Sequence, residues 1–128
     1  MLLVDEIVEQ TDDTIHCRKQ FSADDFFVQG HFPNFPLVPG VILCECAMQA
    51  GAILLASKAS DSENSVPVAT RIDGVRFKNM VRPGDTIDIH ITLDETVSGA
   101  FFLTAKILNA GSNSARLKFA CTLASPSA

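Results

Sequence analysis

One stretch of the chain constrains the fold more than any other, because residues 41–56 are apolar apart from Glu45 and Gln49. Alanine and leucine favour helix, and Pro39-Gly40 directly before the stretch marks a helix start. The stretch is shorter than the roughly 20 residues of a membrane span, and it contains a carboxylate. We therefore expect a long helix from Val41 to Ala56 that is apolar on every face and buried inside a domain, with no membrane span.

Apolar and polar residues alternate on both sides of this helix, as is typical of half-buried strands. The pattern predicts strands over residues 14–21, 87–93, 101–108 and 115–123, and the opening residues 1–5 are also interpreted as a strand. Short turns containing glycine separate the last three strands. At 128 residues the chain is the size of a single domain, so we expect one α+β domain, residues 1–128, with an antiparallel sheet packed around a long central helix.

Two segments after the helix interrupt this regularity. Residues 57–65 are polar and are predicted to form a surface loop. Asp73-Gly74 stands between two apolar runs, a pattern that ordinarily signals a tight hairpin within residues 66–81.

Charge and cysteine content exclude several classes of function. The net charge is -5 and the pI is about 5.0, which argues against nucleic acid as the main partner because phosphate binding needs a basic surface. The four cysteines form no CxxC pair and no zinc-site spacing, so we expect reduced thiols in the cytoplasm. Neither GxSxG nor GxGxxG occurs, which leaves serine hydrolase and dinucleotide-binding functions without support.

Glu45 is the first candidate for chemistry, since a carboxylate within an apolar helix would lose most of its hydration. The alternative is a structural glutamate paired with a cation or with Gln49, four residues further on the same face. His31 is the second candidate, because it lies in the proline-rich loop over residues 22–40. His16 and His90 occupy the polar sides of alternating strands and are assigned to solvent.

Gly40 adds a third element at the helix start. Unsatisfied amides in the first turn of a helix present positive ends to a carbonyl oxygen, and the carbonyl of a thioester would fit there. Such donors stabilise the negative charge that forms when a proton beside the carbonyl is removed. The alternative is that Gly40 only follows Pro39 in a tight start of the helix.

Residues 30–45, GHFPNFPLVPGVILCE, resemble the signature of the 3-hydroxyacyl-acyl-carrier-protein dehydratases of the FabZ type. That signature has a GHFP loop, a P-x-x-P-G helix start and an acidic residue fourteen positions after the histidine, as His31 and Glu45 are here. A second, weaker match covers residues 72–77 and 81–85. The family runs a strand through this stretch, so the resemblance overrides the hairpin at Asp73-Gly74.

The resemblance implies a hotdog fold and a hydro-lyase that converts (3R)-3-hydroxyacyl-acyl-carrier-protein to the trans-2-enoyl thioester in fatty acid biosynthesis. It implies that His31 is the base near C2, that Glu45 assists loss of the 3-hydroxyl, and that Gly40 gives an amide to the thioester oxygen. No metal and no organic cofactor is expected. The further residues expected to contact substrate are Phe32, Val41 and Gln49.

The resemblance also implies partners. We expect a homodimer that joins two sheets, in which each active site takes the histidine from one subunit and the carboxylate from the other, and hexamers built as trimers of dimers. Residues 71–82 carry a net charge of +3, from four cations less Asp73, and could steer an acidic acyl carrier protein. The cations predicted to bind this partner are Arg71, Arg76, Lys78 and Arg82.

Two other functions remain open at this point. A hotdog thioesterase would use a carboxylate on the same helix to activate water against the acyl carbonyl, and a non-catalytic acyl-carrier-binding subunit would keep the fold without turnover. The sequence departs from the family pattern at Phe35, where arginine is common, and at Val38, where methionine is common. These changes affect substrate or carrier recognition more than the chemistry.

Overall fold

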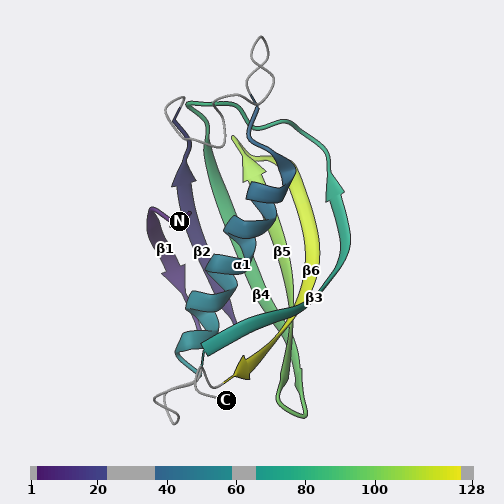
Figure 1. Ribbon diagram of the computed structural model, residues 1–128. Coiled ribbons are helices and arrows are strands. Elements are labelled where there is room, and N and C mark those ends of the chain that lie inside the picture. Colours follow the sequence, from purple (N-terminus) through teal and green to yellow (C-terminus); the bar gives the residue numbers. More distant parts are fainter. Residues whose placement is uncertain (1–2, 23–36, 59–65, 125–128) are drawn as a thin grey trace.

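The computed structural model describes residues 3–22, 37–58 and 66–124, which form an antiparallel sheet and a helix (Figure 1). The strands follow the order β1-β2-β4-β5-β6-β3 across a six-stranded sheet, so that β1 and β3 form its edges. The elements are β1 (Glu6–Gln10), β2 (Thr14–Gln20), α1 (Gly40–Ala56), β3 (Val66–Phe77), β4 (Thr86–Val97), β5 (Ala100–Asn109) and β6 (Ser112–Ala124).

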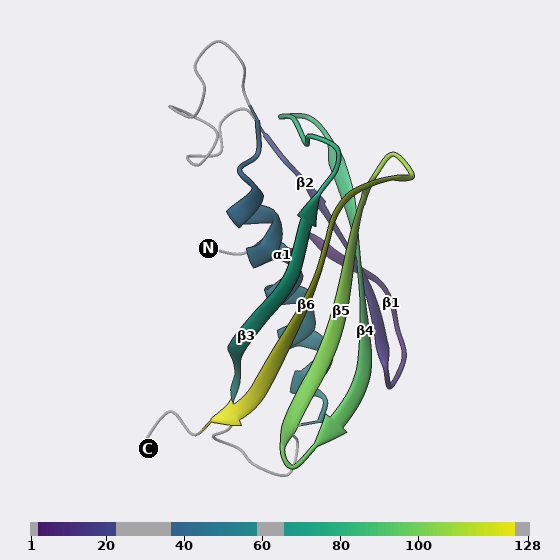
Figure 2. The same ribbon diagram turned by 90° about the vertical axis from the view of Figure 1, so that its right-hand side faces the viewer.

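The helix α1 lies along one face of the sheet, and the views in Figures 1 and 2 show the other face without a covering element among the described residues. Alternate residues of the central strands form the core with the helix, as Ile87, Ile89 and Ile91 of β4 do at 1% exposure or less. Burying each such side chain contributes about 1.5–3 kcal/mol. The predicted α+β hotdog arrangement is confirmed, as are the four strands predicted within residues 14–21, 87–93, 101–108 and 115–123.

The position of α1 also agrees with the sequence, but its burial differs from the prediction. The helix begins after Pro39, whose carbonyl accepts the Ile42 amide at 3.0 Å. Its fully buried residues, such as Cys46, Ala50 and Leu54, face the sheet, whereas Val41 is 71% exposed. The expectation that every face is buried is therefore wrong for the single chain, because a sheet on one side can cover only one face of a helix.

The strand β3 is continuous through Asp73 and Gly74, so the hairpin suggested by these two residues is wrong and the strand implied by the family resemblance is right. Pairing with β6 shifts register between Asp73 and Arg76, which marks a bulge. Gly74 has φ of +59°, a backbone conformation that glycine adopts without strain. Gly74 therefore lies in a bulge within one strand and not in a turn between two strands.

The start of the chain also differs from the prediction. Regular pairing begins at Glu6, and Leu3, Val4 and Asp5 are not part of β1. Leu3 donates its amide to the side chain of Gln49 at 2.6 Å, and Asp5 is the first residue to bond to β2, through Arg18. The opening residues bind the helix before they join the sheet.

A polar network occupies the outer face of β2 and β4, where His16 and His90 lie on the polar sides of their strands as predicted but are half-buried by their neighbours. His16 contacts Asp88 at 2.7 Å and stacks on His90, with ring centroids 4.1 Å apart, and Arg18 also binds Asp88 at 3.0 Å. Burial alone would raise the pKa of Asp88, but the hydrogen bonds from His16 and Arg18 outweigh it and lower this pKa.

The contact between α1 and β6 predicts the effect of Gly51→Ala. An added Cβ at Gly51 would lie 2.7 Å from the Phe119 ring, so the substitution overpacks the core at a cost of about 1–3 kcal/mol, against a gain in helix propensity of about 1 kcal/mol. We expect a lower free energy of unfolding by urea denaturation. The matched double variant Gly51→Ala/Phe119→Leu should recover stability, and a single variant as stable as wild type would contradict the close packing.

A second prediction concerns acid stability. The pKa of His90 lies below its ordinary value of 6.5 because of burial first, then the charges of His16 and Lys106, which outweigh the opposing effect of Asp88. Below pH 6.5 the unfolded chain therefore binds a proton that folded His90 resists, so the free energy of unfolding falls as the pH falls. We expect the loss of stability between pH 7.5 and 5.5, measured by urea denaturation, to be smaller in His90→Gln than in wild type. An unchanged loss would show that His90 does not contribute.

Candidate active site

Glu45 lies on α1 at the mouth of a small pocket between the helix and two strands. The pocket has a volume of about 250 Å³. Residues three, four and seven positions after Glu45 share its helix face and line the pocket with it. The complete lining is Glu45, Met48, Gln49 and Ala52 of α1, Pro67 and Ala69 of β3, and Cys121 of β6.

Gln49 positions the carboxylate of Glu45. Its Nε2 donates to Oε1 of Glu45 at 3.5 Å, while its own Oε1 accepts the Leu3 amide at 2.6 Å. Because an N–H group occupies the amide oxygen, the amide nitrogen must face Glu45. The contact with Glu45 is long and therefore weak. Gln49 orients the carboxylate and leaves its oxygens available to other hydrogen-bond donors. The pairing with Gln49 that the sequence offered as a structural alternative is thus present, and it is compatible with chemistry at Glu45.

The start of α1 provides backbone donors about 7 Å along the helix axis from Glu45, at 1.5 Å per residue. Ile42 and Leu43 direct their amides to the carbonyl of Pro39. For the amides of Gly40 and Val41, no acceptor lies among the residues that the structure describes. The ring of Phe77 packs on Gly40, where a Cβ would lie 2.7 Å from its Cζ. A side chain at this position would have to displace the exposed Phe77 ring, so the helix start and β3 lie in close contact.

Of the six residues predicted for catalysis and substrate binding, Glu45 and Gln49 line the pocket, whereas Gly40 and Val41 do not. Gly40, Val41, Glu45 and Gln49 follow one another along the first turns of α1. His31 and Phe32 lie outside the described residues, so their positions relative to Glu45 remain predictions.

Sequence reasoning missed several residues around this site. Met48 and Ala52 could have been found, since they follow Glu45 at helical spacing. Phe77 and the strand residues of the pocket could not, because nothing in the sequence shows which part of β3 crosses the helix. Cys121 is buried beside the same pocket, and burial raises the pKa of its thiol.

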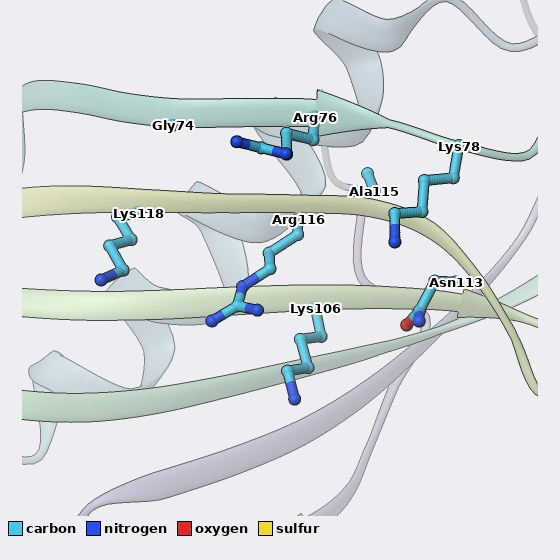
Figure 3. Close-up of a pocket in the computed structure, with 8 residues that line it drawn as sticks. All are labelled: Gly74, Arg76, Lys78, Lys106, Asn113, Ala115, Arg116 and Lys118. Atoms are coloured by element: carbon cyan, nitrogen blue, oxygen red, sulfur yellow. The ribbon is translucent and has the colours of Figure 1, made fainter.

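The cations predicted to bind a partner separate into two groups. Arg76 and Lys78 line a groove of about 500 Å³ on the sheet face opposite α1 (Figure 3). Arg71 instead forms an ion pair with Asp73 at 2.6 Å, and Arg82 lies in the connection between β3 and β4. Sequence reasoning missed three further cations of this groove, Lys106, Arg116 and Lys118, because they come from β5 and β6.

The described side chains form no metal site and no disulfide. Within residues 3–22, 37–58 and 66–124, no three His, Cys, Asp or Glu side chains are grouped so that they could hold a metal ion. All four cysteines are free, and burial raises the pKa of Cys46 to about 12. No helix in the described part of the chain is long and apolar enough to cross a membrane.

Comparison with known proteins agrees with the geometry. The model of the ApeI-like family, described as ApeI dehydratase, matches residues 7–121. The chain is 39% identical over 99 residues to the 3-hydroxyacyl-[acyl-carrier-protein] dehydratase FabZ of Pseudothermotoga lettingae, covering 77% of this chain and 69% of that protein. It is 34% identical over 126 residues to the enzyme of the same name from Burkholderia cenocepacia, covering 96% of this chain and 81% of the relative.

Solved structures share the fold. The dehydratase heterocomplex ApeI:P from Xenorhabdus doucetiae superposes with a TM-score of 0.81 at 16% identity, over 98% of this chain and 85% of that one. The PaaI protein of E. coli superposes with a TM-score of 0.75 at 16% identity, over 91% and 81% of the two chains. At these identities the structures establish the fold alone. Together with the family match over residues 7–121 and the sequence relatives, they show that this chain belongs to the ApeI-like, FabZ-type family of hotdog-fold dehydratases.

Proposed function

We propose that the chain dehydrates (3R)-3-hydroxyacyl chains carried on acyl carrier protein to trans-2-enoyl thioesters, as a hydro-lyase of fatty acid biosynthesis. The observation that carries this proposal is the carboxylate of Glu45, which lines a pocket and lies on a helix whose first two amides have no acceptor among the described residues, in a member of a dehydratase family. The names of its relatives supply the substrate class.

Each group has one task in the reaction. His31 removes a proton from C2 of the substrate, and the amide of Gly40 stabilises the charge that develops on the thioester oxygen. Glu45 protonates the departing 3-hydroxyl, so the C3–O bond breaks, the C2=C3 bond forms and water leaves. Hydroxide is a poor leaving group and the C2 proton is weakly acidic, so each acid/base contribution is about 10²- to 10⁴-fold. Phe32, Val41 and Gln49 contact or orient the substrate, and no metal or organic cofactor takes part.

The free edge of the sheet supports a homodimer. β3 pairs with β6 on one side only, and its large apolar side chains are exposed, with Val68 at 41% and Ile72 at 44%. An unpaired, apolar strand edge is a template for another strand. We propose that β3 pairs with its copy in a second chain, and that trimers of such dimers form hexamers.

The location of the pocket connects this dimer to catalysis. Pro67 and Ala69 of β3 form part of the wall around Glu45, so a partner chain seated on β3 would border the same pocket. We propose that the partner contributes its His31 there. We also place the enzyme in the cytoplasm, which the four free cysteines support.

Assay of a 3-hydroxyacyl thioester tests the function directly. Wild type should produce the enoyl absorbance without free thiol, whereas Glu45→Gln and His31→Ala should each lower kcat at least 100-fold. Glu45→Gln keeps the size of the side chain, and Glu9→Gln on the exposed β1 controls for loss of charge. Release of free thiol by wild type would identify a thioesterase, absence of any turnover would identify a non-catalytic subunit, and activity within tenfold in either variant would remove that residue from the mechanism.

Mixed dimers test whether two chains share each site. His31→Asn and Glu45→Gln chains carry different affinity tags, are co-expressed and are purified through both tags. In such a dimer one site contains both substitutions and the other contains neither, so about half of wild-type activity should return if every dimer is mixed, and about a quarter if hexamers contain randomly paired dimers. Homodimers of each variant, taken from the same preparation, give the inactive baseline. If the doubly tagged dimers are no more active than that baseline, each site lies within one chain.

A further inference from the structure

Five cations gather on the outer face of β5, β6 and β3, although the chain as a whole has a net charge of -5. Lys106 is the direct cross-strand neighbour of Arg116, and Arg116 is the direct neighbour of Arg76. His90 continues the same row onto β4, opposite Lys106. Like charges directly opposite each other destabilise a sheet, so each of the two like-charged pairs in this row lowers the stability of the fold.

The residues around the groove do not neutralise it. The cations of the row are joined by Lys118, two residues further along β6, and by Lys78, the first residue after β3. None of the lining residues is an aspartate or glutamate. Asp73 is opposite Lys118 in register, but its carboxylate forms an ion pair with Arg71.

The shape of the groove also favours an anionic occupant. Its volume is about 500 Å³, and Gly74, which has no side chain, leaves space beside the long cationic side chains (Figure 3). The lining contains no aromatic side chain. Recognition here depends on charge, which acts mainly on the rate of encounter and on its dependence on salt.

The groove and the catalytic helix meet at the same end of β3. Successive side chains of a strand point to opposite faces, and Arg76 and Lys78 line the groove while Phe77 between them packs on Gly40. One strand therefore separates the groove from the helix start. A partner held in the groove could pass a long flexible arm around the end of β3 to the site where we place the thioester.

We propose that this outer groove, and not the segment Arg71–Arg82 as a whole, docks the acidic surface of the acyl carrier protein. The proposal rests on the proposed function, since only an enzyme acting on carrier-bound chains has use for such a partner. Charge complementarity selects the occupant, and the position of Phe77 relates docking to catalysis.

Charge reversal tests the docking site. The double variant Arg116→Glu/Lys118→Glu is compared with Arg71→Glu/Arg82→Glu, which changes the net charge equally but lies outside the groove. Both are assayed with the acyl chain on carrier protein and on N-acetylcysteamine, a short carrier-free thiol. At low salt the groove variant should raise KM for the carrier-bound substrate at least tenfold with kcat unchanged, while the control variant stays within threefold. Carrier-free turnover should stay within twofold of wild type in both.

Two further readouts separate docking from a structural role. Because Arg116 lies between two like charges, its reversal should leave Tm equal to or above that of wild type. The wild-type KM for the carrier-bound substrate should rise with salt towards that of the variant.

An unchanged KM, or equal losses of activity with both substrates, overturns the docking site. Inorganic pyrophosphate bound by wild type and lost in the variant, with carrier KM unchanged, would also overturn it in favour of a small polyphosphate. Wild type inactive on both substrates would instead refute the proposed function.

Discussion

The close approach of α1 to the inner face of the sheet fixes the position of every other feature of the site. Small residues make this approach possible, because Gly51 contacts the Phe119 ring and Ala47 and Ala50 are fully buried. Protein interiors are packed as densely as organic crystals, so a helix held this closely cannot slide or rotate freely. Glu45 consequently faces the pocket on the side of β3 and β6, and Gly40 starts the helix under Phe77.

The same packing explains how much the sequence could predict. The apolar run at residues 41–56 predicted the position of the helix but not which face is buried, whereas the period-two alternation of Ile87, Ile89 and Ile91 predicted both the strand and its buried face. Local signals failed where tertiary contacts decide. Asp73-Gly74 reads as a turn in isolation, yet pairing with β6 on both sides of it keeps β3 continuous.

The candidate site follows the same rule. Gly40, Glu45 and Gln49 could be predicted because they share one helix, whose geometry is known from sequence spacing alone. The outer groove could be predicted only in part, since Arg76 and Lys78 are two residues apart in sequence but far from Lys106, Arg116 and Lys118. Strand register, which no local pattern specifies here, joins these two sets of cations.

The bond between the Leu3 amide and Gln49 has a practical consequence for handling this protein. The backbone of the opening segment is connected to Glu45 through Gln49, so a shift of Leu3 would move the side chain that contacts the carboxylate. Affinity tags and fusion partners therefore belong at the other terminus. When two preparations differ in specific activity, the residues that precede Leu3 in each should be compared first.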